Sequence, residues 1–191
     1  ELETTIAGEV KGFEPIDYVS RKQVRRMDRF SQMAAAAALE AVEQAELSID
    51  GHNSARVAVI IASSMGGIIT LSEQLAVLAD RGTSRVSPFL VPKMLPDMAS
   101  GQVSMLLGAK GPNFSPASAC SSGADALGVA LALLRDGSAD VAIAGGSEAA
   151  ICPVGVAGFN SCQALSKRNH DPKGASRPFD AERDGFVLGE G

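Results

Sequence analysis

Hydrophobic residues in this chain gather into short continuous runs separated by longer segments of mixed pattern. The run from Val57 to Ile61 is rich in β-branched residues and is bounded by two serines. A short run without polar alternation predicts a strand buried on both faces of a sheet. A second run from Asp140 to Ala144, followed by two glycines, predicts another short buried strand.

The segments between these runs predict helices. Ser20 has the character of an N-cap for one long helix that extends to about Ala45. The other expected helices are 68–79, 96–107 with Pro96 at the first helical position and Gly108 closing the end, and 154–161. This order of strands and helices predicts an α/β layered sheet with helices on its faces.

The remaining segments predict less regular structure. Residues 1–15 are expected to form an extended arm, and 87–92 should be irregular because its two prolines do not fit inside a regular element. Residues 163–184 are polar and loop-like, and a further strand is expected to begin within 185–191.

The stretch from Pro116 to Gly123 carries the strongest chemical signal. It predicts a strand end, a sharp turn and a helix start, with Cys120 at the bend. The following residues, 124–134, are apolar except for Asp125, which predicts a helix buried on most sides. A helix start favours the thiolate, the nucleophilic form of cysteine, and its N–H groups can hold an oxyanion. The alternative is that Cys120 is simply a small buried apolar residue.

Composition narrows the classes of function. Across 191 residues the formal net charge is −5, which argues against general nucleic-acid binding. The three cysteines are irregularly spaced with no CxxC pair, so we expect reduced thiols in a cytoplasmic protein and neither a disulfide framework nor a zinc site. No uncharged apolar run is long enough to predict a membrane span. The chain starts with neither Met nor a signal-peptide pattern, so we expect it to begin within a longer protein or after processing.

Two further features each allow two interpretations. Five cations fall within residues 21–29, and they form either a solvated helix face or a docking patch for an acidic partner. The loop Ser63–Gly67 resembles phosphate-binding loops in its glycines but lacks their spacing, so nucleotide binding is not expected. Met65 at its tip is either a packing residue or part of an apolar pocket.

Several segments, taken together and in order, resemble the β-ketoacyl-acyl-carrier-protein synthases, especially the type II elongating enzymes of bacterial fatty-acid synthesis. The matching segments are Ile6-Ala7-Gly8-Glu9-Val10, Arg25 to Phe30, Ser87-Pro88-Phe89, Gly111-Pro112-Asn113, Ala119 to Gly123, Ala139-Asp140-Val141, Ala144-Gly145-Gly146 and Ser176 to Gly191. The resemblance implies a thiolase-like layered fold in two similar α/β halves. It also implies that residues 1–191 form about the first half, lacking the opening strand and the whole second half.

The resemblance implies that Cys120 accepts an acyl chain from acyl carrier protein as a thioester. Decarboxylation of malonyl-carrier protein then gives a carbanion that attacks this thioester and extends the chain by two carbons. Such chemistry calls for covalent catalysis and for no metal or other cofactor.

The resemblance also assigns roles outside the nucleophile. Lys22, Arg25 and Arg26 are expected to dock the carrier protein, although Gln163 stands where many relatives have a further basic residue. Met65 is expected at the base of the acyl pocket. A homodimer paired through the strand before Cys120 is implied, with the segment around Phe89 and Leu90 near the interface.

The family's two catalytic histidines come from the second half. His52 and His170 match neither of them and are expected at the surface, so these residues alone are not expected to condense acyl chains. Two alternatives remain open: a polyketide-type ketosynthase, and a non-catalytic partner that keeps the thiolase-like fold. The second normally loses the nucleophile, and Cys120 is present.

Overall fold

The computed structural model describes residues 2–191. In chain order the helices and strands are α1 (Arg21–Val24), α2 (Arg29–Gln44), β1 (Val57–Ala62), α3 (Ile68–Arg81), α4 (Leu90–Met94), α5 (Met98–Leu107), α6 (Ser122–Arg135), β2 (Val141–Gly146) and α7 (Pro153–Ser161). Short 3-10 turns lie at Pro15–Asp17, Ser54–Arg56, Thr83–Arg85, Ala119–Ser121 and Pro172–Gly174.

The sheet consists of the two strands that the apolar runs predict. β1 and β2 are parallel, with Val57 opposite Val141 and Ala62 opposite Gly146. A single bridge between Val59 and Asn113 brings the segment before Cys120 alongside β1. The prediction of a strand that ends just before Cys120 is therefore wrong: this segment follows β1 but makes one isolated bridge and no strand of its own.

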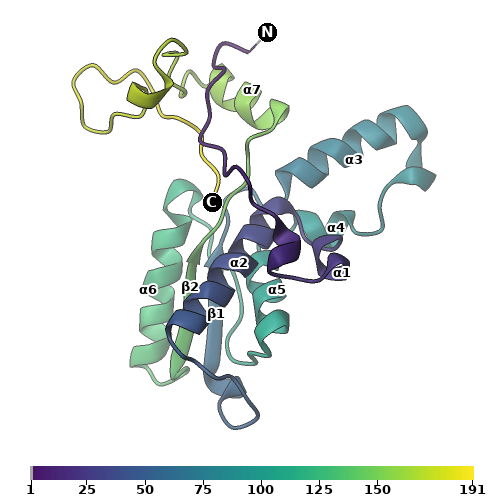
Figure 1. Cartoon of the computed structure of the whole chain (residues 1–191), viewed down its shortest axis with the longest axis vertical. Coiled ribbons are helices and arrows are strands. Elements are labelled where there is room, and N and C mark those ends of the chain that lie inside the picture. Colours follow the sequence, from purple (N-terminus) through teal and green to yellow (C-terminus); the bar gives the residue numbers. More distant parts are fainter. Residues whose placement is uncertain (1) are drawn as a thin grey trace.

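Helices cover both faces of the sheet, as the sequence predicts. α6 lies on one face, and α2 and α5 lie on the other (Figure 1). Alternate side chains of β1 enter different cores, because successive residues of a strand point to opposite faces. Residues 57, 59 and 61 join the core beneath α2 and α5, while residues 58, 60 and 62 join the core beneath α6. Burial on both faces explains the continuous apolar run.

The prediction of one long helix from Ser20 to about Ala45 is wrong. Ser20 does cap a helix, in a capping box with Gln23, but that helix is the four-residue α1. A new helix, α2, begins after Asp28, whose carboxylate accepts hydrogen bonds from the Phe30 amide and from the Thr70 amide in α3. Asp28 thus caps α2 locally and also contacts a distant helix, and local pattern does not reveal the second contact.

The prediction that the helix after Cys120 is buried on most sides is also wrong for residues 2–191. Ala126 and Ala130 of α6 pack on the sheet. On the outer side of α6, Leu127, Leu131 and Leu134 are 57%, 46% and 40% exposed. An apolar composition all around a helix predicts burial, but the described chain supplies a packing partner for only one face.

Other expectations differ in detail. Pro92 lies inside the short helix α4, where its position in the first turn leaves the hydrogen-bonding pattern intact. α5 begins at Met98, two residues after the expected Pro96, and ends as predicted at Gly108 in the left-handed conformation. Residues 185–191 form isolated bridges, Leu165 with Phe186 and Gly8 with Gly189, and no strand.

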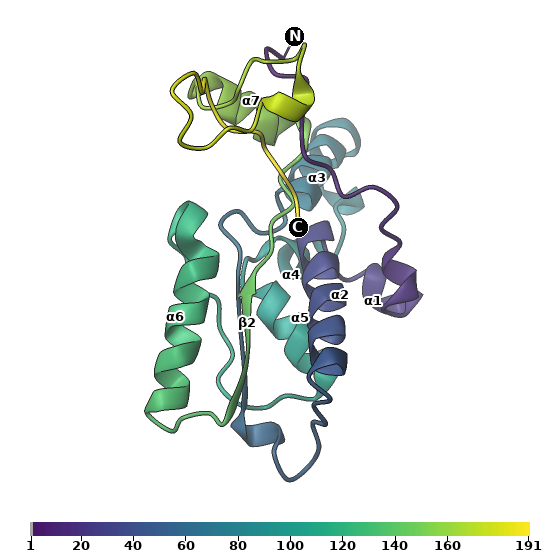
Figure 2. The same cartoon turned by 60° about the vertical axis from the view of Figure 1, so that its left-hand side comes forward.

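The N-terminal arm and the C-terminal segment run together above the sheet (Figure 2). The Gly8 amide donates to the Leu188 carbonyl at 2.8 Å, and the Glu190 amide donates to the Gly8 carbonyl at 3.1 Å. α7 and the 163–184 loop lie at the same end of the molecule. Within residues 2–191 no helix combines the length and apolarity needed to cross a membrane.

Candidate active site

The candidate site lies where the two parallel strands end. β1 leads into the loop Ser63–Gly67, β2 leads into Ser147 and Glu148, and α6 begins beside them. The carboxyl ends of adjacent parallel strands meet at one edge of a sheet, where α/β folds place their ligands. Three segments far apart in the sequence therefore converge there.

Cys120 lies at the bend that the sequence predicts. It belongs to the 3-10 turn Ala119–Ser121, directly before α6, and its side chain is exposed. The preceding Ala119 has a φ of +53°, a left-handed conformation that non-glycine residues rarely adopt. The Ser122 hydroxyl braces this bend by donating to the Ala119 carbonyl at 2.6 Å and accepting from the Ser118 amide at 2.9 Å.

The start of α6 approaches the end of β2 closely where Gly123 meets Gly146. A side-chain carbon on Gly146 would lie 3.0 Å from the Cα atom of Gly123. A Cβ atom at this distance would force the neighbouring backbone to shift slightly, so the close packing of helix start and strand end favours glycine at position 146. The approach holds Cys120 over the edge of the sheet.

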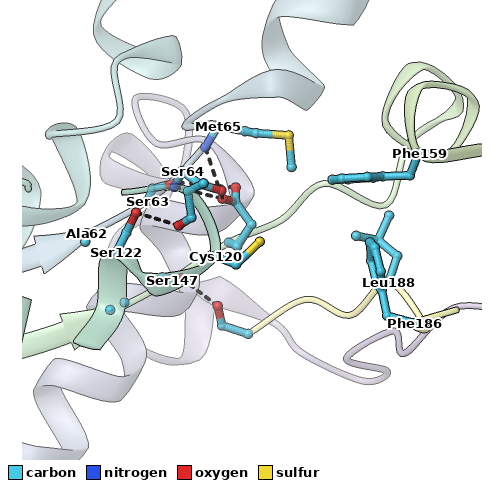
Figure 3. A pocket seen from close by; sticks show the side chains of 15 residues that line it. Ala62, Ser63, Ser64, Met65, Cys120, Ser122, Ser147, Phe159, Phe186 and Leu188 are labelled. Carbon is cyan, nitrogen blue, oxygen red and sulfur yellow. Dashed lines mark hydrogen bonds between the residues drawn. The ribbon is translucent and has the colours of Figure 1, made fainter. Parts of the chain in front are cut away.

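Cys120 opens into a cavity of about 350 Å³, here named the Cys120 pocket. It is lined by Ala62, Ser63, Ser64, Met65, Ala119, Cys120, Ser122, Gly123, Gly146, Ser147, Glu148, Phe159, Phe186, Leu188 and Gly191. In Figure 3 the Cys120 sulfur points into the space between Met65 on one side and Phe159 and Leu188 on the other. Met65 thus lies in the lining of this pocket, which contains an exposed thiol beside largely apolar side chains.

The start of α6 has no side-chain cap: its N-cap residue, Ser121, makes no capping hydrogen bond. The Ser121 hydroxyl instead donates to the Ser118 carbonyl at 2.9 Å. An uncapped helix start favours a negative charge placed beside it. The arrangement is suited to a thiolate and to an oxyanion formed when that thiolate attacks a carbonyl.

The segment that closes one side of the pocket is held by an ion pair. Arg29 donates to the two carboxylate oxygens of Glu190 at 2.8 and 2.6 Å, and Glu190 is almost completely buried. The hydrogen bond from Arg29 lowers the pKa of Glu190, and the same bond raises the pKa of Arg29. The pair fixes residues 188–191 against the start of α2.

The predicted docking cations form a separate surface. Lys22, Arg25 and Arg26 are exposed on and just after α1. With Arg21 and Phe89 they line a second hollow, and the Arg26 guanidinium lies 5.8 Å from the centre of the Phe89 ring. Among the ion pairs found within residues 2–191, none involves these three cations. Their charge is therefore available to a partner.

His52 and His170 are exposed, as predicted, and neither lines the Cys120 pocket. Gln163 is exposed as well, and it accepts a hydrogen bond from the Lys167 ammonium at 2.9 Å. Lys167 thus brings a positive charge next to this position, although it also pairs with Glu3. Over the described range 2–191 no group of three His, Cys, Asp or Glu side chains is arranged to hold a metal ion.

Sequence reasoning missed part of the pocket wall. Phe159 from α7, Phe186 and Leu188 from the C-terminal segment and Glu148 after β2 all line it. Glu148 had a usable signal, because it follows a predicted parallel strand and so had to lie at the carboxyl edge. The three apolar residues carried no such signal, because their segments reach the pocket only through the tertiary fold.

Comparison with known proteins accords with this geometry. The family model described as the N-terminal domain of β-ketoacyl synthase matches residues 3–191. Proteins named 3-oxoacyl-(acyl-carrier-protein) synthase 2 from Synechocystis sp. and Staphylococcus aureus are each 48% identical to the chain, over 96% and 97% of its length. The chain spans 44% and 45% of those two proteins, and so about half the length of the curated relatives it matches.

Solved structures of ketosynthases also resemble this chain. A β-ketoacyl synthase from Burkholderia phymatum is 33% identical, with a TM-score of 0.88 over 100% of this chain and 47% of that one. The ishigamide ketosynthase/chain length factor is 27% identical, with a TM-score of 0.87 over 99% of this chain and 46% of that one. The fold is thus that of the thiolase-like ketosynthases, as the sequence predicts, and the chain belongs to the β-ketoacyl synthase family.

Proposed function

We propose that this chain is the cysteine-bearing first half of a 3-oxoacyl-acyl-carrier-protein synthase of fatty-acid biosynthesis, with Cys120 as its nucleophile. The observation that carries the proposal is the exposed thiol of Cys120, which lies at an uncapped helix start and opens into an apolar pocket. The relatives named 3-oxoacyl-(acyl-carrier-protein) synthase 2 support the choice of reaction.

In the proposed reaction the Cys120 thiolate attacks the thioester carbonyl of an acyl-carrier protein. A new C–S bond forms at Cys120, and the thiol of the carrier leaves. Malonyl-carrier protein then loses CO₂, and its carbanion attacks the acyl-cysteine carbonyl. The C–S bond breaks, the Cys120 thiolate is released, and the product carries a 3-keto group on a chain two carbons longer.

The described groups support different steps of this scheme. The start of α6 stabilises the thiolate and the oxyanion of the first step. The wall formed by Met65, Phe159 and Leu188 holds the acyl chain away from water. Stabilisation of the carbanion is assigned to histidines outside this chain, so residues 1–191 alone are expected to lack condensing activity.

Selective alkylation tests the nucleophile. Cys162 is also exposed and Cys152 is half-buried, so the chain contains its own controls. Iodoacetamide should modify Cys120 about tenfold faster than Cys162, because the thiolate is the reactive form and a helix start favours it. Equal rates at the two exposed cysteines would contradict the proposed role.

Lys22, Arg25 and Arg26 are proposed to dock the acidic carrier protein. In the full-length protein, Arg25→Glu should raise the KM for acyl-carrier protein about tenfold with little change in kcat, and added salt should reduce the difference. Lys110→Glu, at an exposed position on the opposite end of the sheet, is the matched control. A fall in kcat at constant KM would instead place Arg25 in the chemistry.

A second copy of the chain is the other proposed partner, paired along the segment before Cys120. The support is that residues 113–118 lie beside β1 with only one bridge, at Asn113, and that Phe114 is 43% exposed. Sedimentation of the full-length protein at twice the monomer mass is expected. Sedimentation as a monomer would remove this part of the proposal.

A polyketide-type ketosynthase is a second candidate, supported by the likeness to the ishigamide ketosynthase/chain length factor, but at 27% identity this support is weaker than that from the relatives at 48%. Analysis of the condensation products of the full-length protein distinguishes the fatty-acid enzyme from the polyketide enzyme. A fatty-acid enzyme should release a product after each single condensation for reduction elsewhere, whereas a polyketide enzyme should extend its own keto product repeatedly.

A further inference from the structure

Glu148 occupies the Cys120 pocket, but the proposed reaction gives it no task. It follows β2 directly, and its side chain is half-buried. Its carboxylate accepts hydrogen bonds from the Ser64 amide at 2.9 Å and the Met65 amide at 3.0 Å. The hydroxyls of Ser64 and Ser63 donate to it at 2.5 and 3.3 Å. One side chain therefore receives four donors from the loop that carries Met65.

The backbone of Glu148 is fixed in its turn. The Glu148 amide donates to the Gly191 carbonyl at 2.8 Å, and the Gly191 amide donates back at 3.0 Å. The neighbouring Ser147 hydroxyl lies within hydrogen-bond distance of the carbonyls of Phe30 in α2, at 2.8 Å, and Gly191, at 2.9 Å. The backbone that carries the carboxylate is thus held by the C-terminal segment and by α2, independently of the loop that the carboxylate contacts.

In the loop Ser63–Gly67, the part that faces the pocket is held by the Glu148 carboxylate. The Gly66 amide donates to the Ser63 hydroxyl and the Gly67 amide donates to the Met94 carbonyl, which fixes the far end of the loop. Among the described residues, the amides of Ser64 and Met65 donate only to Glu148. Within that same range Glu148 takes part in no ion pair, so loop amides and hydroxyls alone balance its charge.

We propose that Glu148 is a positioning residue that fixes the backbone of Met65 in the pocket wall and thereby sets the length of acyl chain that Cys120 accepts. A methionine side chain is flexible, so the place of this wall is decided by where its backbone is held. Removing the carboxylate releases both amides, and the loop then moves relative to Cys120. This inference rests on the proposed acyl transfer to Cys120.

The test measures acylation of Cys120 by two acyl donors of different length. It compares these rates with alkylation by iodoacetamide, a small reagent that does not need the pocket. The full-length protein is incubated with hexanoyl-pantetheine or dodecanoyl-pantetheine, and acylation of Cys120 is followed by mass spectrometry. These small donors bypass the docking cations. In Glu148→Ala the ratio of the two rates should change about fivefold, the effect of losing the equivalent of one hydrogen bond. Alkylation of Cys120 by iodoacetamide should stay within about twofold of wild type, because that reagent does not use the wall.

Milder variants keep the test decisive if Glu148→Ala fails to fold. Glu148→Gln keeps one good acceptor, and Ser64→Ala removes a single hydroxyl donor at an exposed position, so each should shift the ratio in the same direction by less. Met65→Ala should also shift the ratio, and adding Glu148→Ala to it should cause little further change, since both act through one wall. Glu43→Ala, an exposed glutamate on α2, is the matched control.

The outcomes separate the two proposals. If neither donor acylates Cys120 in the wild-type protein, the proposed function fails and this inference fails with it. If the wild type is acylated but Glu148→Gln and Ser64→Ala leave the ratio unchanged, only the inference is overturned. A parallel fall in both acylation rates and in the alkylation rate would show that Glu148 is merely structural, which also overturns it.

Discussion

The starts of α2 and α6 lie on opposite faces of one sheet and are built in opposite ways. α2 begins directly after its N-cap residue Asp28, which is 2% exposed and whose carboxylate accepts hydrogen bonds from amides of both α2 and α3. α6 begins without a side-chain cap, after a left-handed alanine, and presents an exposed thiol. We call the capped start of α2 the closed start and the uncapped start of α6 the open start. The closed start stabilises the fold, whereas the open start leaves its partial positive charge available to a reacting group.

The largest expected effect is at the closed start. Asp28→Ala in the full-length protein should lower the free energy of unfolding by about 3 kcal/mol, because it removes a helix cap and leaves the buried Thr70 hydroxyl and two amides unpaired. Denaturant titration followed by circular dichroism would measure the loss. A change below about 1 kcal/mol, the usual value for one cap, would mean that Asp28 does not join the two helices.

The ion pair beside the same start gives the next effect. Glu190→Gln should cost about 2 kcal/mol at neutral pH, between the values typical of exposed and buried pairs. The pKa of Glu190 is lowered in the folded protein, chiefly by its hydrogen bond with Arg29. Its contribution is therefore present above the unfolded-state pKa of about 4.3, and it is lost as pH falls through the lower folded-state pKa.

Stability measured from pH 7 downward checks this expectation. Wild type should lose part of its stability in the acid range, while Glu190→Gln should start lower and show a shallower decline. Parallel curves for the two proteins would mean that Glu190 does not contribute to the acid dependence.

A smaller effect of opposite sign is expected at the open start. Ala119 has a φ of +53°, so Ala119→Gly should raise the free energy of unfolding by about 0.5–1 kcal/mol by relieving strain. The same change should slow acylation of Cys120, because the bend that aims the thiol becomes more mobile. A gain in stability with unchanged acylation would show that the strained bend is not needed for the reaction.

The smallest effect should come from Ser121, the N-cap residue of α6. Its hydroxyl makes no capping bond and is exposed, so Ser121→Ala should change stability by less than about 0.5 kcal/mol. A loss comparable to that of Asp28→Ala would remove the contrast between the two helix starts. Thermal unfolding of both variants under one condition makes the comparison direct.

Much of the fold could be predicted from local pattern. The strands 57–62 and 141–146, the helices 68–81 and 153–161, and the turn at Cys120 are encoded by short continuous segments. The break before α2 was missed although Asp28 is a local N-cap signal that accepts a hydrogen bond from the Phe30 amide. Only the second hydrogen bond of Asp28, with Thr70, 42 positions along the chain, could not be predicted. The exposed leucines of α6 were missed for a related reason: composition indicates an apolar helix but not how many of its faces the chain covers.

The candidate site, like the fold, could be predicted only in part from local sequence. Cys120 and Met65 could be singled out because a cysteine at a predicted helix start and a methionine in a glycine-rich loop after a strand are local signals. Phe159, Phe186 and Leu188 could not, because apolar residues in helices and loops are common and only the fold brings these to one cavity.

The sequence by itself determined the two strands, most of the helices, the bend that carries Cys120 and the membership in its family, because each depends on neighbouring residues or on a series of local motifs. The tertiary structure alone decided that the carboxylate capping α2 also holds α3, and that Glu148 holds the loop of Met65 across the pocket. Those features depend on hydrogen bonds between residues 42 to 85 positions apart. Such contacts form only when the chain is folded, since no local pattern specifies which distant donor a buried carboxylate will meet.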